Sequence, residues 1–159
     1  MRRATLFLFA ALCVACALPA AGADAGEGVV PGAMRVATLV IDTRSGRQIE
    51  YTVELALSAA ERRQGLMGRH RLAPDAGMLF DFGAAQPIAM WMRNTYLALD
   101  MVFADEAGVI VDIIAHTPPL SEALLMPRAA ARYVLELGAG QTAAQGIAAG
   151  DRLRLRTSP

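Results

Sequence analysis

The order of apolar and polar positions predicts a chain built mainly of short strands. β-branched and apolar residues fill 34–41, a turn-like stretch covers 42–46, and apolar and polar residues alternate through 49–55. Alternation with a period of two places every second side chain on one face of a sheet, so we expect these segments to pair as a hairpin. Further strand-like segments occupy 77–82, 88–92, 97–104, 109–115, 132–137 and 151–156.

Helical signals are few. Ser58 is followed three residues later by Glu61, which is the pattern of a capping box and predicts a helix of about two turns ending near 65–68. Residues 141–147 are a candidate for one further helical turn, and 105–108 predict a hairpin turn. Short strands without a repeated strand–helix–strand pattern predict a mainly β single domain, a sandwich or a barrel, with one or two short helices.

The first residues differ from the rest of the chain. Arg2 and Arg3 precede an uncharged apolar run over 4–18, and small residues follow at 21–23. This pattern is typical of a secretory signal peptide, and the run is shorter than the roughly 20 residues that span a bilayer. We therefore expect a signal peptide over 1–23, cleavage before Asp24, and a mature chain that lies outside the cytoplasm, periplasmic or secreted, without a transmembrane span.

The remainder divides into a flexible lead-in over 24–33 and a single β domain over 34–157. An alternative for the leader is a lipoprotein anchored at Cys16, although Cys13 stands three residues earlier, where a large aliphatic residue is usual. Both cysteines lie in the leader. Cleavage would leave a mature chain with no disulfide, no thiol nucleophile and no thiolate metal site.

Charge narrows the possible functions. The chain has 15 basic and 15 acidic residues, and every basic residue is an arginine. Loss of Arg2 and Arg3 leaves 13 basic against 15 acidic residues, a net charge of −2. This balance does not favour a nucleic-acid partner, which needs a net positive face. The absence of lysine excludes a lysine nucleophile and a phosphate-loop lysine.

Polar residues inside apolar segments are the best candidates for a binding site. Asp100 and Glu136 interrupt such segments, and burying a carboxylate is costly unless it is paired. One interpretation has them facing solvent or pairing with arginines at 69, 93 or 132. The other has some of them lining a pocket in which a guanidinium binds an anion and an indole stacks on a ring. The candidate ligand-binding residues are Arg69, Trp91, Arg93, Asn94, Asp100 and Glu136.

Two alternatives remain open. Asp100 or Glu136 with His116 would suit an acid–base hydrolase, provided that the side chains share one cleft. A copper(I) site would need at least three converging thioethers, although methionine also fills irregular cores. The methionines concerned are Met67, Met78, Met90, Met92 and Met101. We assign no catalytic residue, metal ligand or cofactor from the sequence, and an enzyme is the less favoured interpretation.

Several blocks in a fixed order carry a family resemblance. They are 61–67 (ERRQGLM), Arg69, 77–80 (GMLF), 90–95 (MWMRNT), 99–100 (LD), Phe103, 133–136 (YVLE), Gly140, 146–147 (GI) and 150–151 (GD). This order resembles domain-of-unknown-function family 192 (DUF192) over about residues 35–156. Arg93 stands where that family commonly has lysine, which keeps the charge but changes the donor geometry, and Ala98 stands where it often has proline.

The resemblance implies a small, mainly β domain, often exported, with no established activity. It therefore supplies no catalytic residues. Together with the candidate residues above, it leads us to expect a monomeric, non-enzymatic binding module. Its partner would be an unknown small polar ligand or a protein of the cell envelope.

Overall fold

The computed structural model describes residues 34–156. The domain contains seven strands and two short helices within this range. Their bounds are β1 Arg35–Asp42, β2 Gln48–Ala56, α1 Ala59–Gln64, β3 Ala76–Gln86, β4 Leu99–Ala104, β5 Ile110–Thr117, β6 Ala131–Gly138, α2 Gln141–Gln145 and β7 Arg152–Leu155. The mainly β fold class is confirmed. Neither helix is long and apolar enough to cross a membrane. The predicted signal peptide and the lead-in lie outside the described residues.

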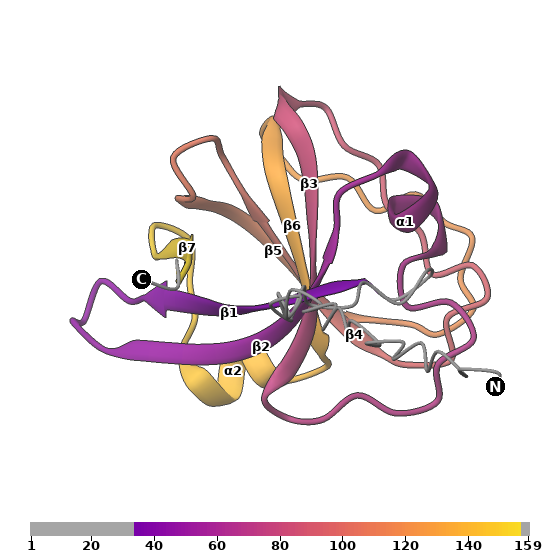
Figure 1. Cartoon of the computed structure of the whole chain (residues 1–159), viewed down its shortest axis with the longest axis horizontal. Helices are drawn as coiled ribbons and strands as arrows, with labels where there is room; N and C mark the ends of the chain where they lie inside the picture. The colour runs from indigo at the N-terminus through magenta and orange to yellow at the C-terminus, as the bar shows by residue number, and fades with distance from the viewer. Residues whose placement is uncertain (1–33, 157–159) are drawn as a thin grey trace, which may run out of the picture. The chain divides into compact units, whose positions relative to one another are not determined.

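All seven strands belong to one sheet, in the order β5-β4-β6-β3-β2-β1-β7. The predicted hairpins over 34–55 and 97–115 are present as antiparallel pairs β1–β2 and β4–β5. The sheet is strongly bent, and Figure 1 shows β3 and β6 crossing the direction of the β1–β2 hairpin. It is not closed into a barrel. Its two edges meet only at the isolated bridge between Val109 and Arg152 and at neighbouring backbone hydrogen bonds.

Two predictions from the sequence need correction. Residues 88–92 were expected to form a strand, but they form a loop with a single isolated bridge, between Met90 and Leu125. The strand was predicted from the apolar residues of this segment. They are apolar because the loop covers the core, in which Ile88 and Met92 are buried. In addition, β2 and β3 pair in parallel with α1 between them, so one strand–helix–strand unit is present where none was expected.

The central strands are buried on both faces. On β4, Val102 belongs to a first core between the bent halves of the sheet, whereas Met101 belongs to a second core on the opposite face. The same division separates Leu135 from Val134 on β6. The second core is covered by loops rather than by strands, since Leu66, Ile88 and Met92 pack into it. This loop-covered face carries the pocket described below.

The contact between the sheet edges predicts a specific sensitivity at Gly108. Its φ is +77°, and a Cβ there would lie 2.3 Å from the backbone oxygen of Leu153 in β7. Gly108→Ala should therefore cost the left-handed strain of about 1–2 kcal/mol plus a further ~1–3 kcal/mol as β7 is displaced. Urea denaturation measures the loss.

Gly46→Ala is the matched control, because Gly46 has φ +83° but nothing within 4 Å of the added Cβ. It should cost only the backbone strain. Equal losses in the two variants would mean that the close approach of β7 to Gly108 contributes nothing to stability.

Candidate functional site

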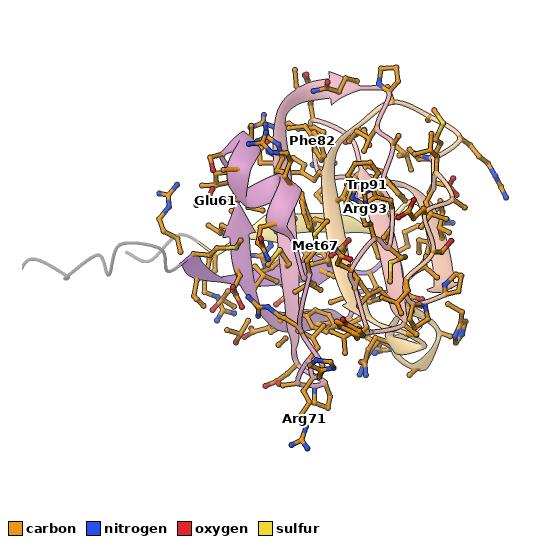
Figure 2. All side chains as sticks on the ribbon, turned by 90° about the vertical axis from the view of Figure 1, so that its right-hand side faces the viewer. Glu61, Met67, Arg71, Phe82, Trp91 and Arg93 are labelled. Atoms are coloured by element: carbon orange, nitrogen blue, oxygen red, sulfur yellow. The ribbon has the colours of Figure 1, made fainter. Side chains whose placement is uncertain are left out.

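A pocket of about 270 Å³ opens on the loop-covered face of the sheet. Its walls come from α1 and the loop after it, from β3, and from the loop over 89–95, and β6 contributes one residue. Figure 2 shows Met67, Phe82 and Trp91 on this side of the domain, with Arg71 projecting at a distant end. The lining residues that matter chemically are Arg62, Arg63, Leu66, Phe80, Trp91 and Glu136.

The predicted capping box fixes the helix beside the pocket. The Glu61 N–H donates to Ser58 Oγ at 3.2 Å, and the Ser58 N–H donates to Glu61 Oε2 at 2.6 Å. The hydrogen bond from the Ser58 backbone to the carboxyl group is the main cause that lowers the pKa of Glu61. Gly65 ends the helix at φ +46°, and a Cβ there would lie 3.3 Å from the Phe80 ring. Helix and aromatic wall are therefore in direct contact.

Arg62 connects α1 to the middle of β3 at the pocket. Its Nη1 donates to the backbone oxygens of Leu57 at 2.5 Å and Asp81 at 2.8 Å. Its guanidinium also lies 5.2 Å from the centroid of the Phe82 ring, a cation–π arrangement. These contacts hold a positive charge at the wall of the pocket.

Glu136 is the unusual residue of this site. It pairs across the sheet with Met78 of β3 and Met101 of β4, so its side chain shares the loop-covered face with theirs. Glu136 is 4% exposed, and its carboxyl group forms no hydrogen bond or ion pair with any residue of 34–156. Burial raises the pKa of Glu136 to about 8. At neutral pH the carboxyl group is therefore mostly protonated and acts as a hydrogen-bond donor.

Asp100 has the opposite environment. It is fully buried, and its Oδ2 accepts hydrogen bonds from Thr142 Oγ1 at 2.6 Å and Thr142 N at 3.0 Å. Its Oδ1 accepts from the His116 N–H at 2.9 Å. Burial raises the pKa of Asp100, but these hydrogen bonds outweigh it and leave the pKa below its ordinary value. Asp100 is thus an ionised anchor that ties the first turn of α2 to the end of β5.

The acid–base hydrolase hypothesis does not fit this arrangement. Asp100 pairs with Leu137 of the first core, whereas Glu136 pairs with Met101 of the second, so the two carboxyl groups point to opposite faces of the sheet. His116 offers its backbone N–H to Asp100. Glu136 lines the pocket without Asp100 or His116, and the contact of His116 with Asp100 is through its backbone, so the cleft that the hypothesis required is not formed there.

The expectation that these carboxylates face solvent or pair with arginine is also wrong. The three arginines concerned bind other carboxylates. Arg69 forms a bidentate pair with Glu54 at 2.5 and 2.6 Å, and Arg132 forms one with Asp81 at 2.9 and 3.0 Å. Arg93 lies 3.3 Å from Glu122 at an exposed position. Neither Asp100 nor Glu136 has an arginine partner among the described residues.

Of the six predicted ligand-binding residues, the structure brings two together. Trp91 and Glu136 both line the pocket, and Trp91 keeps 44% of its surface exposed. Arg93 lies outside it, with its guanidinium 5.6 Å from the centroid of the Trp91 ring. Asn94 is exposed, and its backbone oxygen accepts from the Gly68 N–H at 2.9 Å. Arg69 and Asp100 also do not line the pocket.

Arg62, Arg63 and Phe80 line the pocket but were not predicted as site residues. The capping box located the helix that carries the two arginines, but it did not indicate which face of the helix meets the sheet. Phe80 looked like any residue of an apolar strand. The parallel pairing of β2 with β3 brings the helix and this ring together. No sequence pattern within either strand predicts that pairing.

The methionines divide into two groups. Met78, Met92 and Met101 are fully buried in the second core, whereas Met67 and Met90 line the pocket. The pocket therefore presents two thioethers, fewer than the copper hypothesis requires. Within residues 34–156, no group of three or more His, Asp or Glu side chains is placed to hold a metal ion.

The burial of Glu136 predicts a pH-dependent stability. Its pKa in the folded protein lies above its ordinary value of 4.5, so the folded state holds a proton that the unfolded chain releases. The contribution of Glu136 is therefore full below about pH 4.5 and is lost as the pH rises toward 8. Relative to wild type, Glu136→Gln should gain up to about 1.4 kcal/mol per pH unit across that window.

Urea denaturation of both proteins at pH 5.5, 6.5 and 7.5 measures this gain. The control is Glu122→Gln, at an exposed position, whose difference from wild type should stay within about 0.5 kcal/mol at each pH. A difference between Glu136→Gln and wild type that does not change with pH would show that Glu136 ionises alike in both states.

Comparison with known proteins places the chain in a family. No curated protein matches the chain, but two solved structures and one family model do. A solved structure from Sinorhizobium meliloti 1021, described as "a putative transcription regulator", is 46% identical, has a TM-score of 0.76, and covers 77% of this chain and 95% of its own. A protein of unknown function from Novosphingobium aromaticivorans DSM 12444 is 30% identical, with a TM-score of 0.73, over 76% of this chain and 86% of its own. The model of DUF192, described as uncharacterized ACR, matches residues 40–155, and the chain belongs to this family.

Proposed function

We propose that this domain is a non-enzymatic binding module that holds a small polar ligand in the pocket above Glu136. The observation that carries the proposal is a buried carboxyl group that lines an open pocket and has no partner among the described residues. The Tyr51 hydroxyl is the fully enclosed side-chain polar atom without a hydrogen bond within residues 34–156, whereas the Glu136 carboxyl group is reached from the pocket. A ligand that hydrogen-bonds to Glu136 would supply the partner that the described residues do not.

The size and walls of the pocket support a small ligand. Its volume of about 270 Å³ lies at the lower end of the range for small-molecule pockets, which is roughly 300–1,000 Å³. Leu66, Phe80 and Trp91 give it apolar and aromatic walls, while the polar groups are few. A few polar groups in an otherwise apolar pocket fix the orientation of a ligand.

The distribution of charge argues against a nucleic-acid partner. The description of the S. meliloti protein concerns transcription, but this chain has 15 basic and 15 acidic residues, and five arginines of residues 34–156 pair with carboxylates. Arg69, Arg132 and Arg154 pair with Glu54, Asp81 and Asp42. Counterion release from DNA requires free cationic side chains on one face. A small ligand in the pocket is the better-supported alternative.

Methionine methyl resonances give a direct test of binding. In protein labelled at the methionine methyl groups, a panel of sugars, amino acids, organic acids and amines is titrated one compound at a time. A ligand of the pocket should shift the signals of Met67 and Met90, which line it, much more than those of Met78, Met92 and Met101 in the core. A panel without any compound that shifts Met67 and Met90 would contradict the proposal.

For a compound that binds, Trp91→Ala should weaken affinity about tenfold, because stacking on a ring contributes roughly 0.5–1.5 kcal/mol beyond the buried area. Tyr96→Ala is the matched control, since Tyr96 is an exposed aromatic residue that stacks on His70 outside the pocket. Equal effects of the two substitutions would rule out binding in this pocket.

We also propose that the module acts outside the cytoplasm. Support comes from the signal-peptide pattern of residues 1–23. The mass of the protein recovered from its native envelope should match residues 24–159. A lipid-bearing mass that starts at Cys16 would identify a lipoprotein instead, and an uncleaved mass would contradict export by signal-peptide cleavage.

A further inference from the structure

The charged groups that line the pocket are unbalanced. Among the described lining residues, only Arg62, Arg63 and Glu136 carry ionisable side chains. Arg62 is held by carbonyl oxygens, and neither arginine forms an ion pair within residues 34–156. A guanidinium stays charged in proteins, so two positive charges face this pocket without a carboxylate partner.

Glu136 does not balance these charges. Its neighbours across the sheet, Met78 and Met101, are uncharged, and the lining residues of the 89–95 loop are not titratable. Arg62 and Arg63 come from α1, whereas Glu136 comes from β6, so the positive groups and the carboxyl group belong to different walls of the pocket.

Both kinds of polar group offer hydrogen-bond donors. The guanidinium groups donate only, and a protonated Glu136 carboxyl group adds an O–H donor from the sheet. A cationic ligand would meet two positive charges, whereas an anion would be attracted. Guanidinium groups also match the geometry of a carboxylate.

We propose that the pocket selects small organic acids whose carboxylate lies against Arg62 and Arg63 and whose second oxygen acceptor, a carbonyl or hydroxyl, takes a hydrogen bond from the Glu136 carboxyl group. The apolar part of such a ligand lies between Phe80 and Trp91. This inference rests on the proposed function and specifies its ligand class. The protonated form of Glu136 is the binding form.

Matched compounds test the charge and the acceptor separately. The probes are 4-oxopentanoate and 4-acetylbenzoate, their amides, the ketone-free analogues pentanoate and 4-ethylbenzoate, and 4-acetylbenzylamine as the cation. Affinities come from the Met67 and Met90 methyl shifts at pH 7. At least one keto acid should bind about tenfold more tightly than its amide, its ketone-free analogue and the amine.

The pH dependence identifies Glu136 as the donor. With a pKa of about 8, the protonated fraction falls from ~0.9 at pH 7 to ~0.1 at pH 9, so keto-acid affinity should fall about tenfold. In Glu136→Gln the amide donates at every pH, and the affinity should stay constant. Arg63→Ala should weaken binding, whereas Arg71→Ala, which removes an exposed arginine away from the pocket, should not.

The outcomes separate this inference from the proposed function. If the amides or the amine bind as tightly as the acids, selection of organic acids is wrong while pocket binding stands. Selection of organic acids is also wrong, and pocket binding stands, if keto-acid affinity rises with pH. The same conclusion follows if none of these probes binds while another compound of the broader panel shifts Met67 and Met90. If no compound of either panel shifts these two signals, both proposals fall.

Discussion

The constraint on which this domain depends is that residues 99–104 of β4 and 134–137 of β6 have no solvent-facing side. β4 is buried at every position, and β6 separates two cores that lie on opposite faces of the sheet. Any polar side chain on these strands must therefore find its partners inside the protein. Asp100 and Glu136 differ in this respect. Asp100 has its hydrogen-bond partners within the protein and stabilises the fold, whereas Glu136 has none among the described residues and is available for binding.

Asp100 is satisfied by the protein itself. Three donors from the end of β5 and the first turn of α2 converge on its two oxygens, which keeps it ionised and fixes both elements. Glu136 has no such donors, and its burial costs stability wherever it would ionise. The fold pairs its other two buried carboxylates, Asp100 and Asp151, and leaves the carboxyl group of Glu136 facing a pocket, where a ligand can supply its partner. Functional sites commonly carry such a cost.

The sequence indicated the elements better than it indicated the site. The two hairpins and the capping box follow from local patterns, because turns and caps are encoded within a few residues. The loop over 88–92 was mistaken for a strand since its apolar residues cover a core, which produces the same composition as a strand. One of the two interpretations had Glu136 and Asp100 facing solvent or arginine, because alternation distinguishes inside from outside only when one face of a sheet is wet. The role of Arg62 and Phe80 depends on the parallel pairing of β2 with β3, which is not a local property.

The blocks of sequence that identified the family gain a physical meaning from this pocket. Four of them, 61–67, 77–80, 90–95 and 133–136, are far apart in the chain, and each contributes residues to its lining. Other blocks of the resemblance stabilise the fold, as the block that contains Asp100 does through the hydrogen bonds of its carboxylate. If these four blocks only stabilised a core, Glu136 would be expected to be apolar, because an apolar residue there would remove the cost of an unpartnered carboxyl group. The combination of an unpartnered carboxyl group, an aromatic wall and two arginines without a carboxylate partner at one pocket is therefore better explained by ligand recognition than by packing.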